Sequence, residues 1–263
     1  MRDLIIVNAD DFGGSDLATA RIAECFASSR ITSTTAMVWM RGSRRAAAIA
    51  AALGIPVGLH LNLTQELDAP AVPIGVRERH TEVVSRLARG RRARMTFDVR
   101  AAGLVRRCIA DQLQCFRDLY GREPTHLDGH NHVHLGPTVL MALPPGLPVR
   151  TAAHPRGRHT LAGDALRAVR RTLIGRRHPC CERFASVDAL ARSSDPETIR
   201  RLVDLAAGHT VELMAHPDRE HTWRLLMSEQ WARALEDRRT GSYADLRELE
   251  HRRFRPGVVG FTR

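Results

Sequence analysis

The segment "THLDGHNHVHL", residues 125–135, places one aspartate and three histidines at every second position: Asp128, His130, His132 and His134. Alternate side chains of an extended chain point to the same face, so this spacing predicts one face with a carboxylate and three imidazoles. On a buried face each of these polar groups needs a partner. A metal site or a proton-transfer site provides such partners. The alternative interpretation is a histidine-rich surface loop.

Side chains of the same types follow or end other apolar runs of the chain. In chain order these residues are Asp10, Asp11, His60, Asn62, Arg150 and His216. Parallel β/α barrels have their active sites at the carboxyl ends of the strands. If the apolar runs are strands of such a barrel, these side chains and those of the histidine-rich segment share one site.

The apolar runs alternate with segments of helical periodicity. The expected strands are 3–10, 31–40, 56–63, 124–130, 148–152, 182–187, 209–216 and 257–262, and the expected helices are 15–29, 44–53, 98–120 and 196–207. Seven or eight β/α units without a GxGxxG turn favour a distorted (β/α) TIM-like barrel over a doubly wound sheet. We interpret residues 1–263 as a single α/β domain. Residues 66–95 are expected to form a long loop or lid, and residues 154–182 a basic insertion, both near the active-site mouth.

The composition narrows the classes of protein. The 263 residues are 43% hydrophobic, which fits a globular protein with a sizeable core. No apolar run approaches the roughly 20 residues that span a bilayer, and the first apolar run is too short for a signal peptide. We therefore expect a cytoplasmic protein that is not integral to a membrane. The five cysteines include no CxxC pair, which predicts free thiols.

The charge is strongly basic, with 40 arginines, no lysine and a net charge of +11. Residues 86–107 hold eight arginines and one acid, and residues 150–178 hold the same numbers. These segments predict a basic rim that would attract an anionic or lipid-linked substrate, although solvated helix faces explain them equally well. No nucleic-acid-binding motif is present, so no nucleic-acid partner is expected. The sequence leaves a homodimer open.

The types of residue at the expected strand ends suit one kind of chemistry. One carboxylate and two imidazoles are a common ligand set for a metal with open positions. A second carboxylate can accept a proton from water, and a histidine across the pocket can protonate a leaving group. The adjacent pair Asp10 and Asp11 supplies two carboxylates at one strand end.

Five motifs carry a resemblance to a known family. "VNADDFG", "TSTTAMV", "GLHLNLT", "THLDGHNHVH" and "ELMAHP" occur in the order seen in the YdjC-like carbohydrate deacetylases, the ChbG/HpnK group. The resemblance implies a distorted barrel of the glycoside hydrolase/deacetylase type that removes N-acetyl groups from amino sugars. It also implies one divalent metal ion, magnesium or zinc, held by Asp11, His60 and His130. By the same resemblance, Asp10 is the general base and His216 the general acid.

Other positions are expected to support these groups. Asn62, Asp128, His132, His134 and Arg150 would orient the ligands or contact substrate, and Arg150 would pair with Asp10. The family commonly has serine in place of Gly129 and histidine in place of Asn131; neither is a ligand in this assignment. Two alternative functions remain. One is a phosphoesterase or cyclic amidohydrolase, many of which carry an HxH pair on the first strand, and the other is a non-enzymatic basic binding protein.

Overall fold

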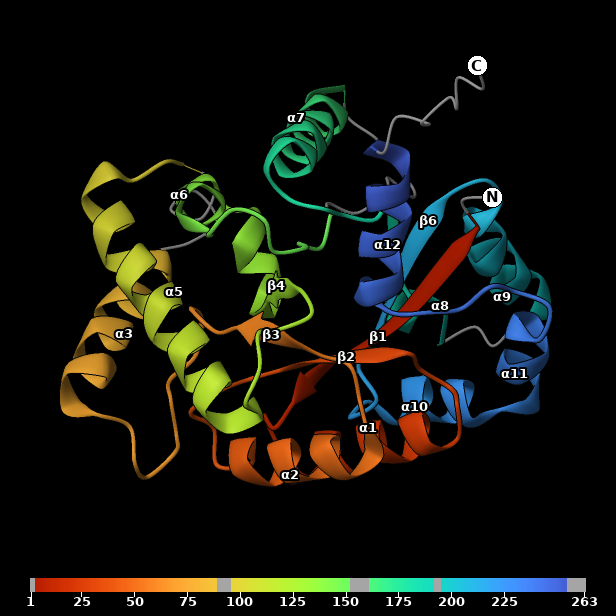
Figure 1. The fold of residues 1–263 in the computed structure, drawn as a ribbon, viewed down its shortest axis with the longest axis horizontal. Coiled ribbons are helices and arrows are strands. Elements are labelled where there is room, and N and C mark those ends of the chain that lie inside the picture. Colours follow the sequence, from red (N-terminus) through yellow and green to blue (C-terminus); the bar gives the residue numbers. More distant parts are fainter. Residues whose placement is uncertain (1–2, 89–95, 152–160, 192–194, 255–263) are drawn as a thin grey trace, which may run out of the picture.

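Six strands of the chain form one sheet in which every pairing is parallel. The computed structural model in Figure 1 describes residues 3–88, 96–151, 161–191 and 195–254. The strands are β1 (Leu4–Phe12), β2 (Ser33–Ala36), β3 (Val57–Leu61), β4 (Leu127–Gly129), β5 (Arg183–Ser186) and β6 (Thr210–Ala215), in the order β4-β3-β2-β1-β6-β5. The chain therefore builds one side of β1 with its first half and the other side with its second half.

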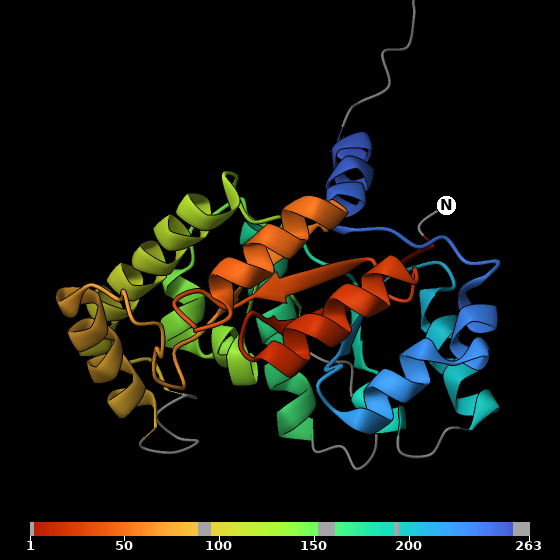
Figure 2. The same ribbon diagram turned by 90° about the horizontal axis from the view of Figure 1, so that it is seen from below.

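Helices follow the strands and cover the sheet (Figures 1 and 2). They are α1 (Asp16–Ala27), α2 (Ser43–Leu53), α3 (Ile74–Leu87), α5 (Val99–Tyr120), α6 (Pro137–Ala142), α7 (Leu161–Arg177), α8 (Asp188–Ala191), α9 (Pro196–Val203), α10 (Glu220–Met227), α11 (Glu229–Leu235) and α12 (Tyr243–Phe254), with short 3₁₀ turns η1 (His130–Leu135) and η2 (Asp204–Ala206). Local signals set several bounds. Ser15 accepts the Ala18 N–H at the start of α1, and Gly54 ends α2 in the left-handed conformation (φ 67°).

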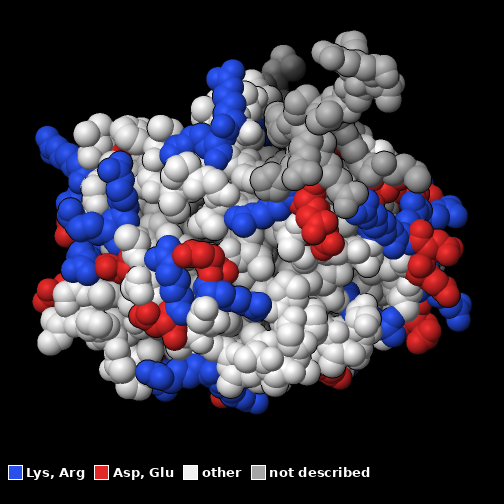
Figure 3. Space-filling model, in the orientation of Figure 1, with Lys and Arg blue, Asp and Glu red and all other residues white. Residues whose placement is uncertain are grey.

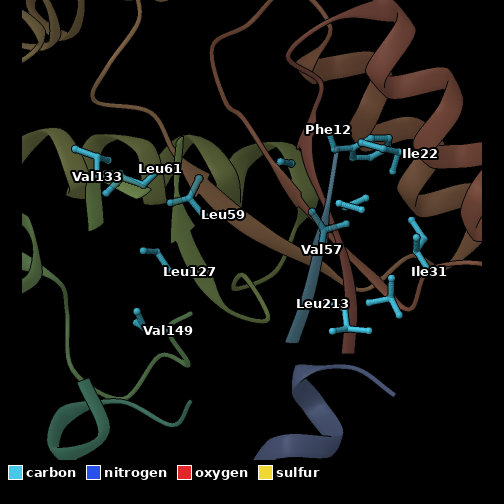
Figure 4. Close-up of a cluster of buried hydrophobic side chains, with 14 of the residues drawn as sticks. Phe12, Ile22, Ile31, Val57, Leu59, Leu61, Leu127, Val133, Val149 and Leu213 are labelled. Carbon is cyan, nitrogen blue, oxygen red and sulfur yellow. The ribbon is translucent and has the colours of Figure 1, made fainter. Parts of the chain in front are cut away.

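The hydrophobic core lies on both faces of the central strands. Apart from the partly exposed Asp11, every residue of β1 is buried, as expected for a parallel strand covered by helices on both sides. Figure 4 shows part of the core, where Phe12, Ile22, Val57 and Leu213 converge. This packing holds the carboxyl ends of the strands in fixed positions.

A three-residue segment, residues 148–150, pairs with β4 at one edge of the curled sheet and contacts the segment before β5; we name it the seam. On one side, the Leu127 N–H donates to the Pro148 carbonyl (2.8 Å) and the Arg150 N–H donates to the Leu127 carbonyl (3.1 Å). On the other side, the Val149 N–H donates to the carbonyl of Pro179 (2.9 Å), shortly before β5 begins. The seam thus extends the β4 edge of the sheet towards the segment that leads into β5, and it is the structural form of the expected strand 148–152.

The distorted barrel predicted from the sequence is confirmed, with corrections in detail. The described residues contain six strands instead of seven or eight, and the expected strand 257–262 lies outside them. Residues 74–87, predicted as loop, form α3, because His80, Val83 and Leu87 recur at helical spacing and are buried. Much of the expected basic insertion is likewise helix, as α7. Within the described residues, no helix is both long and apolar enough to cross a membrane.

Candidate active site

A cavity of about 390 Å³ opens where the carboxyl ends of β1, β3, β4, β5 and β6 meet. Its lining contains most of the polar residues that the sequence analysis placed at strand ends. The lining residues are Asp10, Asp11, His60, Gly129, His130, Asn131, His132, Ser186, Asp188, Met214, His216 and Arg219. A larger hollow of about 510 Å³ lies between α9 and α11, but no histidine lines it. The concentration of titratable groups therefore identifies the strand-end cavity as the candidate active site.

The two adjacent aspartates at the end of β1 reach different partners because the strand is irregular there. The register of the β1–β2 pairing shifts between Ala9 and Phe12, and Asp11 has a left-handed backbone (φ 70°). The Gly14 N–H donates to the Asp11 carbonyl (2.9 Å) and holds this turn. As a result Asp10 points into the buried charge network, while the Asp11 side chain remains about 21% exposed at the cavity.

Two buried ligand atoms face each other without a hydrogen-bond partner. His60 Nδ1 lies 2.6 Å from Asp128 Oδ1, which makes Nδ1–H the donor and leaves the Nε2 lone pair free in the neutral ring. That Nε2 lies 3.2 Å from Asp11 Oδ1, yet neither atom has a hydrogen bond of acceptable geometry. A buried imidazole lone pair and a carboxylate oxygen left in this way fit the donor set of a metal ion.

The charges around His60 explain the direction of the pKa shifts in this pair. Burial alone would lower the pKa of His60, but the negative charge of Asp128 and the close contacts with Asp11 and Asp128 raise it well above its usual value. Burial opposes ionisation of Asp11, yet its contact with His60 lowers the pKa of Asp11 below its usual value. A cation bound here would have to displace the proton of His60.

His130 is fixed at the cavity by a turn that follows β3. Its Nδ1 lies 2.6 Å from Thr64 Oγ1, and its ring centre is 5.8 Å from that of His60. Asn62, which does not line the cavity, holds the turn through its side-chain oxygen, which accepts the N–H groups of Thr64 (3.2 Å) and Gln65 (3.1 Å). Burial and the charge of His60 lower the pKa of His130 and so favour the neutral ring that binds metals.

A second group of possible ligand atoms, from Asp10, His60 and Asp128, is less suited to a cation. The fully buried Arg150 contacts both of its carboxylates, so a positive charge already occupies that position. The site as a whole still has an excess of negative charge. It contains five carboxylates, those of Asp10, Asp11, Asp128, Asp188 and Glu212, and two guanidiniums, those of Arg150 and Arg219, a balance of −3 with neutral histidines. A divalent cation would offset most of this charge.

Arg150, in the seam, is the centre of the buried network. It donates to both oxygens of Asp10 (2.7 and 2.6 Å), as the sequence predicted, and from Nε to Glu212 Oε1 (2.8 Å). The Tyr243 hydroxyl donates to the other Glu212 oxygen (2.5 Å). Burial raises the pKa of Glu212, although Arg150 opposes that shift. The bidentate contact fixes the orientation of Asp10.

His216 lies across the cavity, directly after β6. Its Nδ1 is 2.6 Å from Asp188 Oδ2, and its backbone N–H donates to Asp188 Oδ1 (3.0 Å). Its Nε2 lies 4.0 Å from Asp10 Oδ2 and 3.8 Å from Asp11 Oδ2. Burial would lower the pKa of His216, but the hydrogen bond with Asp188 and the charge of Asp10 raise it. This imidazole can therefore hold a proton near neutral pH.

His132 and His134 differ from the prediction of one extended face. The strand ends at Gly129, and the chain turns through η1, where Asn131 and His132 have positive φ (54° each). His132 lines the cavity, and its ring lies 5.7 Å from that of Phe184. His134 is outside the cavity lining and fully buried, and neither of its ring nitrogens has a hydrogen bond. The alternation rule failed because it assumed that the strand continued.

The glycine that ends β4 leaves room for a close approach of the chain in this turn. A Cβ added at Gly129 would lie 3.0 Å from the His134 backbone nitrogen and 3.1 Å from its Nδ1. A serine at this position, common in the family named above, would need the neighbouring residues Val133 and His134 to shift slightly. The tight η1 turn places His130 and His132 at the cavity and His134 behind it.

Sequence reasoning missed several residues of the site, and three of them, Asp188, Glu212 and Tyr243, differ in the signal that the sequence offered. Asp188 directly follows the run "ERFASV", so the strand-end rule applied to that run would have found it. Glu212 interrupts the apolar run "HTVELMAH", and a charge inside a buried strand signals a partner. Tyr243 had no signal in the sequence, because its contact with Glu212 depends on how α12 packs.

The expected basic rim is only partly visible. Arg150 is fully buried within the network and is not part of a rim. The arginines at 89–94 and 156–158 lie outside the described residues. The exposed arginine that lines the cavity is Arg219, whose Nη1 lies 2.9 Å from Asp188 Oδ2.

A family comparison agrees with this geometry. The model of the YdjC-like protein family matches residues 4–255. The chain belongs to this family. It is 37% identical over 169 residues to a chitooligosaccharide deacetylase of Serratia marcescens, a match that covers 62% of this chain and 64% of that protein, less than two thirds of its length. It is 31% identical over 244 residues to a mouse carbohydrate deacetylase, which covers 81% of this chain and 77% of that one.

Solved structures support the fold. A candidate cellobiose-phosphate cleavage protein of Enterococcus faecalis V583 superposes with a TM-score of 0.68 at 19% identity, over 94% of this chain and 99% of that one. The Xyl-CE4 domain of a xylanase from the hindgut metagenome of Trinervitermes trinervoides superposes with a TM-score of 0.52 at 10% identity. This match covers 95% of this chain and 92% of that one. The two relatives, both named as deacetylases, do not favour the phosphoesterase, amidohydrolase or binding-protein alternatives.

Proposed function

We propose that this YdjC-like protein is a divalent-metal-dependent hydrolase that removes the acetyl group from an N-acetylated amino sugar. The observation that carries the proposal is the pair of buried, unbonded ligand atoms, Asp11 Oδ1 and His60 Nε2, opposite the His216–Asp188 pair. Two relatives named as deacetylases of chitooligosaccharides and of carbohydrates support the substrate class. We treat residues 1–263 as one catalytic domain, because both halves of the chain contribute to the cavity.

Asp11, His60 and His130 would hold the metal ion. When bound, a divalent cation polarises an amide carbonyl and lowers the pKa of a water molecule. Two imidazole nitrogens and one carboxylate favour zinc over magnesium, which prefers oxygen ligands. Asp128 would keep the His60 ring in the tautomer that binds metal, and Thr64 would orient His130.

Asp10 would act as the general base. Arg150 holds both of its oxygens, so the carboxylate is already oriented before substrate arrives. As the water oxygen forms a bond to the acetamide carbon, Asp10 accepts the proton that the water loses. Preorganisation of this kind avoids reorientation of the base during the reaction.

His216 would act as the general acid. Its Nδ1–H bonds Asp188, and Nε2 carries the proton that the leaving nitrogen needs when the carbon–nitrogen bond breaks. The products are acetate and the free amine of the sugar. His132, Ser186 and Met214 line the rest of the cavity and would contact the sugar.

The deciding experiment is acetate release from a panel of acetylated amino sugars, including N-acetylchitooligosaccharides. We expect activity that is lost with a chelator and restored by a divalent metal, with zinc more effective than magnesium at equal free concentration. Activity that a chelator leaves unchanged would contradict the metal-dependent mechanism. No acetate from any sugar of the panel would contradict the assigned reaction.

A further inference from the structure

Helix α7 carries an apolar stripe on its outer face. The stripe consists of Leu166, Val169 and Leu173, which are 40%, 54% and 38% exposed. Spacings of three and four residues place all three on one side of the helix. A third of the large apolar side chains that are exposed in the described residues lie on this stripe. Single exposed apolar residues are ordinary, but a stripe of them usually marks an interaction surface.

The inner side of α7 and its last turn anchor the helix to the protein. Ile174 is fully buried in the core, and the His178 N–H donates to its carbonyl (2.8 Å). The Arg177 guanidinium donates to the carbonyls of Leu140 (3.5 Å) and Leu143 (3.3 Å), beside α6. The helix is therefore held by its inner face, and the stripe is not needed to complete the core.

The charge of α7 is complementary to an anionic surface. The helix contains five arginines and one aspartate, a net charge of +4, within a chain of net charge +11. Arg176 is exposed on the same outer side as the stripe. Figure 3 shows basic side chains at the position of α7, with uncharged surface beside them. An exposed arginine next to an outward apolar stripe, on a helix of net positive charge, is the pattern of helices that lie in the surface of anionic bilayers.

We propose that α7 docks the protein on the surface of an anionic lipid bilayer, with Leu166, Val169 and Leu173 inserted between the headgroups. A second copy of the chain fits the stripe less well. The exposed surface area of three partly exposed side chains is far smaller than the ~800 Å² of surface that each partner buries in a stable complex. Two copies with this net charge would also repel each other.

Docking also defines the substrate class, in a step that rests on the proposed deacetylase function. An enzyme held at a bilayer surface meets acetylated amino sugars that are attached to lipid. Docking would raise the local concentration of such a substrate, while a water-soluble acetylated sugar would gain nothing from it.

The test is co-sedimentation of the full chain with vesicles of phosphatidylcholine, with or without phosphatidylglycerol. We expect binding to the anionic vesicles that weakens with salt. Replacing the stripe by Leu166→Gln with Leu173→Gln should lower the partition coefficient by at least about tenfold. Arg176→Gln should lower it about fivefold on anionic vesicles only.

The matched control is Ile74→Gln with Val99→Gln, which removes apolar side chains that are 78% and 75% exposed on α3 and α5. This variant should bind the vesicles like the unchanged chain. Equal loss in the control and stripe variants would overturn the proposal, as would undiminished binding of the stripe variant. A dimer in light scattering that only the stripe variant dissociates, with vesicle binding unchanged, would assign the stripe to contact between copies.

Activity assays separate this proposal from the proposed function. All variants should release acetate equally from a water-soluble N-acetylchitooligosaccharide, and only the stripe and Arg176 variants should lose activity on an acetylated glycolipid in vesicles. Vesicle binding without acetate release from any substrate would contradict the deacetylase function but leave docking intact. Equal glycolipid turnover by stripe variant and unchanged chain would overturn the substrate class.

Discussion

Two histidine–aspartate pairs face each other across the cavity, and they have the same local geometry but different surroundings. In both His60–Asp128 and His216–Asp188, Nδ1 lies 2.6 Å from the carboxylate. His60 is fully buried, and its Nε2 faces the Asp11 carboxylate at 3.2 Å. His216 lies at the more open side of the cavity, with its Nε2 about 4 Å from two carboxylates. The same pair can therefore serve either as a metal ligand or as a proton donor.

The arginines beside the two aspartates extend this difference. Asp128 contacts Arg150, which is fully buried and bound on several sides, so the pair is rigid and isolated from water. Asp188 contacts Arg219, whose side chain is about half exposed. Burial and the Asp128–Arg150 contact thus fix the orientation of the His60 ring on one side of the cavity, where a bound cation would take the place of its proton. On the other side of the cavity, the partial exposure of the His216–Asp188 pair favours a proton that can exchange with solvent.

The largest effect should follow from removal of a metal ligand. Asp11→Ala, His60→Ala and His130→Ala should each lose bound metal and lower kcat by about three orders of magnitude, because the metal contributes several kcal/mol to the reaction. Metal analysis, activity and circular dichroism of each purified variant would measure this. Full metal occupancy of a folded His130→Ala protein would remove His130 from the ligand set.

The next effect should come from the proton-transfer groups. Asp10→Asn and His216→Ala should lower kcat by about 10²- to 10⁴-fold while the metal content stays unchanged, because proton transfer is lost but the ligands are not. Steady-state kinetics together with metal analysis would separate these variants from the ligand variants. Turnover of Asp10→Asn at nearly the original rate would assign the base to another group.

Replacing the aspartate of each histidine–aspartate pair should have a smaller effect than the variants above. The two replacements should nevertheless separate the roles of the two pairs more clearly. Asp128→Asn should weaken metal affinity about 10- to 100-fold, with activity restored by excess metal. Asp188→Asn should leave metal affinity unchanged and lower kcat. Asp188 raises the pKa of His216, so its loss should lower that pKa and move the alkaline limb of the kcat profile to lower pH. An unchanged limb in Asp188→Asn would contradict the assignment of His216 as the acid.

The smallest effect should come from Tyr243→Phe. The variant removes one hydrogen bond to Glu212 and keeps the ring that stacks on His126 (3.8 Å between centres). We expect about 1 kcal/mol of lost unfolding free energy and a reduction of kcat by a few fold with an unchanged KM. Denaturant unfolding and kinetics would measure both, with Tyr120→Phe, a tyrosine away from the site, as the control.

The strand-end rule explains how much of this site could be predicted from the sequence. Asp10, Asp11, His60 and His216 were placed correctly at the cavity, because an apolar run followed by a polar residue marks where a parallel strand ends. Their roles remain proposals, since geometry brings the groups together without showing what each one does. The same rule would have found Asp188 if it had been applied to every run.

Other features depended on three-dimensional packing. The η1 turn, with two residues of positive φ, could not be read from alternating histidines, and it removed His134 from the cavity. The seam was predicted as a full strand, but it forms only an isolated bridge to β4 and one hydrogen bond to Pro179. Helix α3 was missed because its arginines and its flanking prolines concealed a weak apolar spacing.

The position of β1 in the middle of the sheet has a consequence for how the protein is made. The three metal-ligand candidates have all been synthesised by residue 130, whereas His216 follows 86 residues later (216 − 130). Until β6 emerges from the ribosome, the edge of β1 that will pair with it has no partner strand. An open strand edge is a template for wrong pairing. We therefore expect nascent chains that end between residues 136 and 209 to depend on chaperones, and that dependence to end once β6 can add to the sheet.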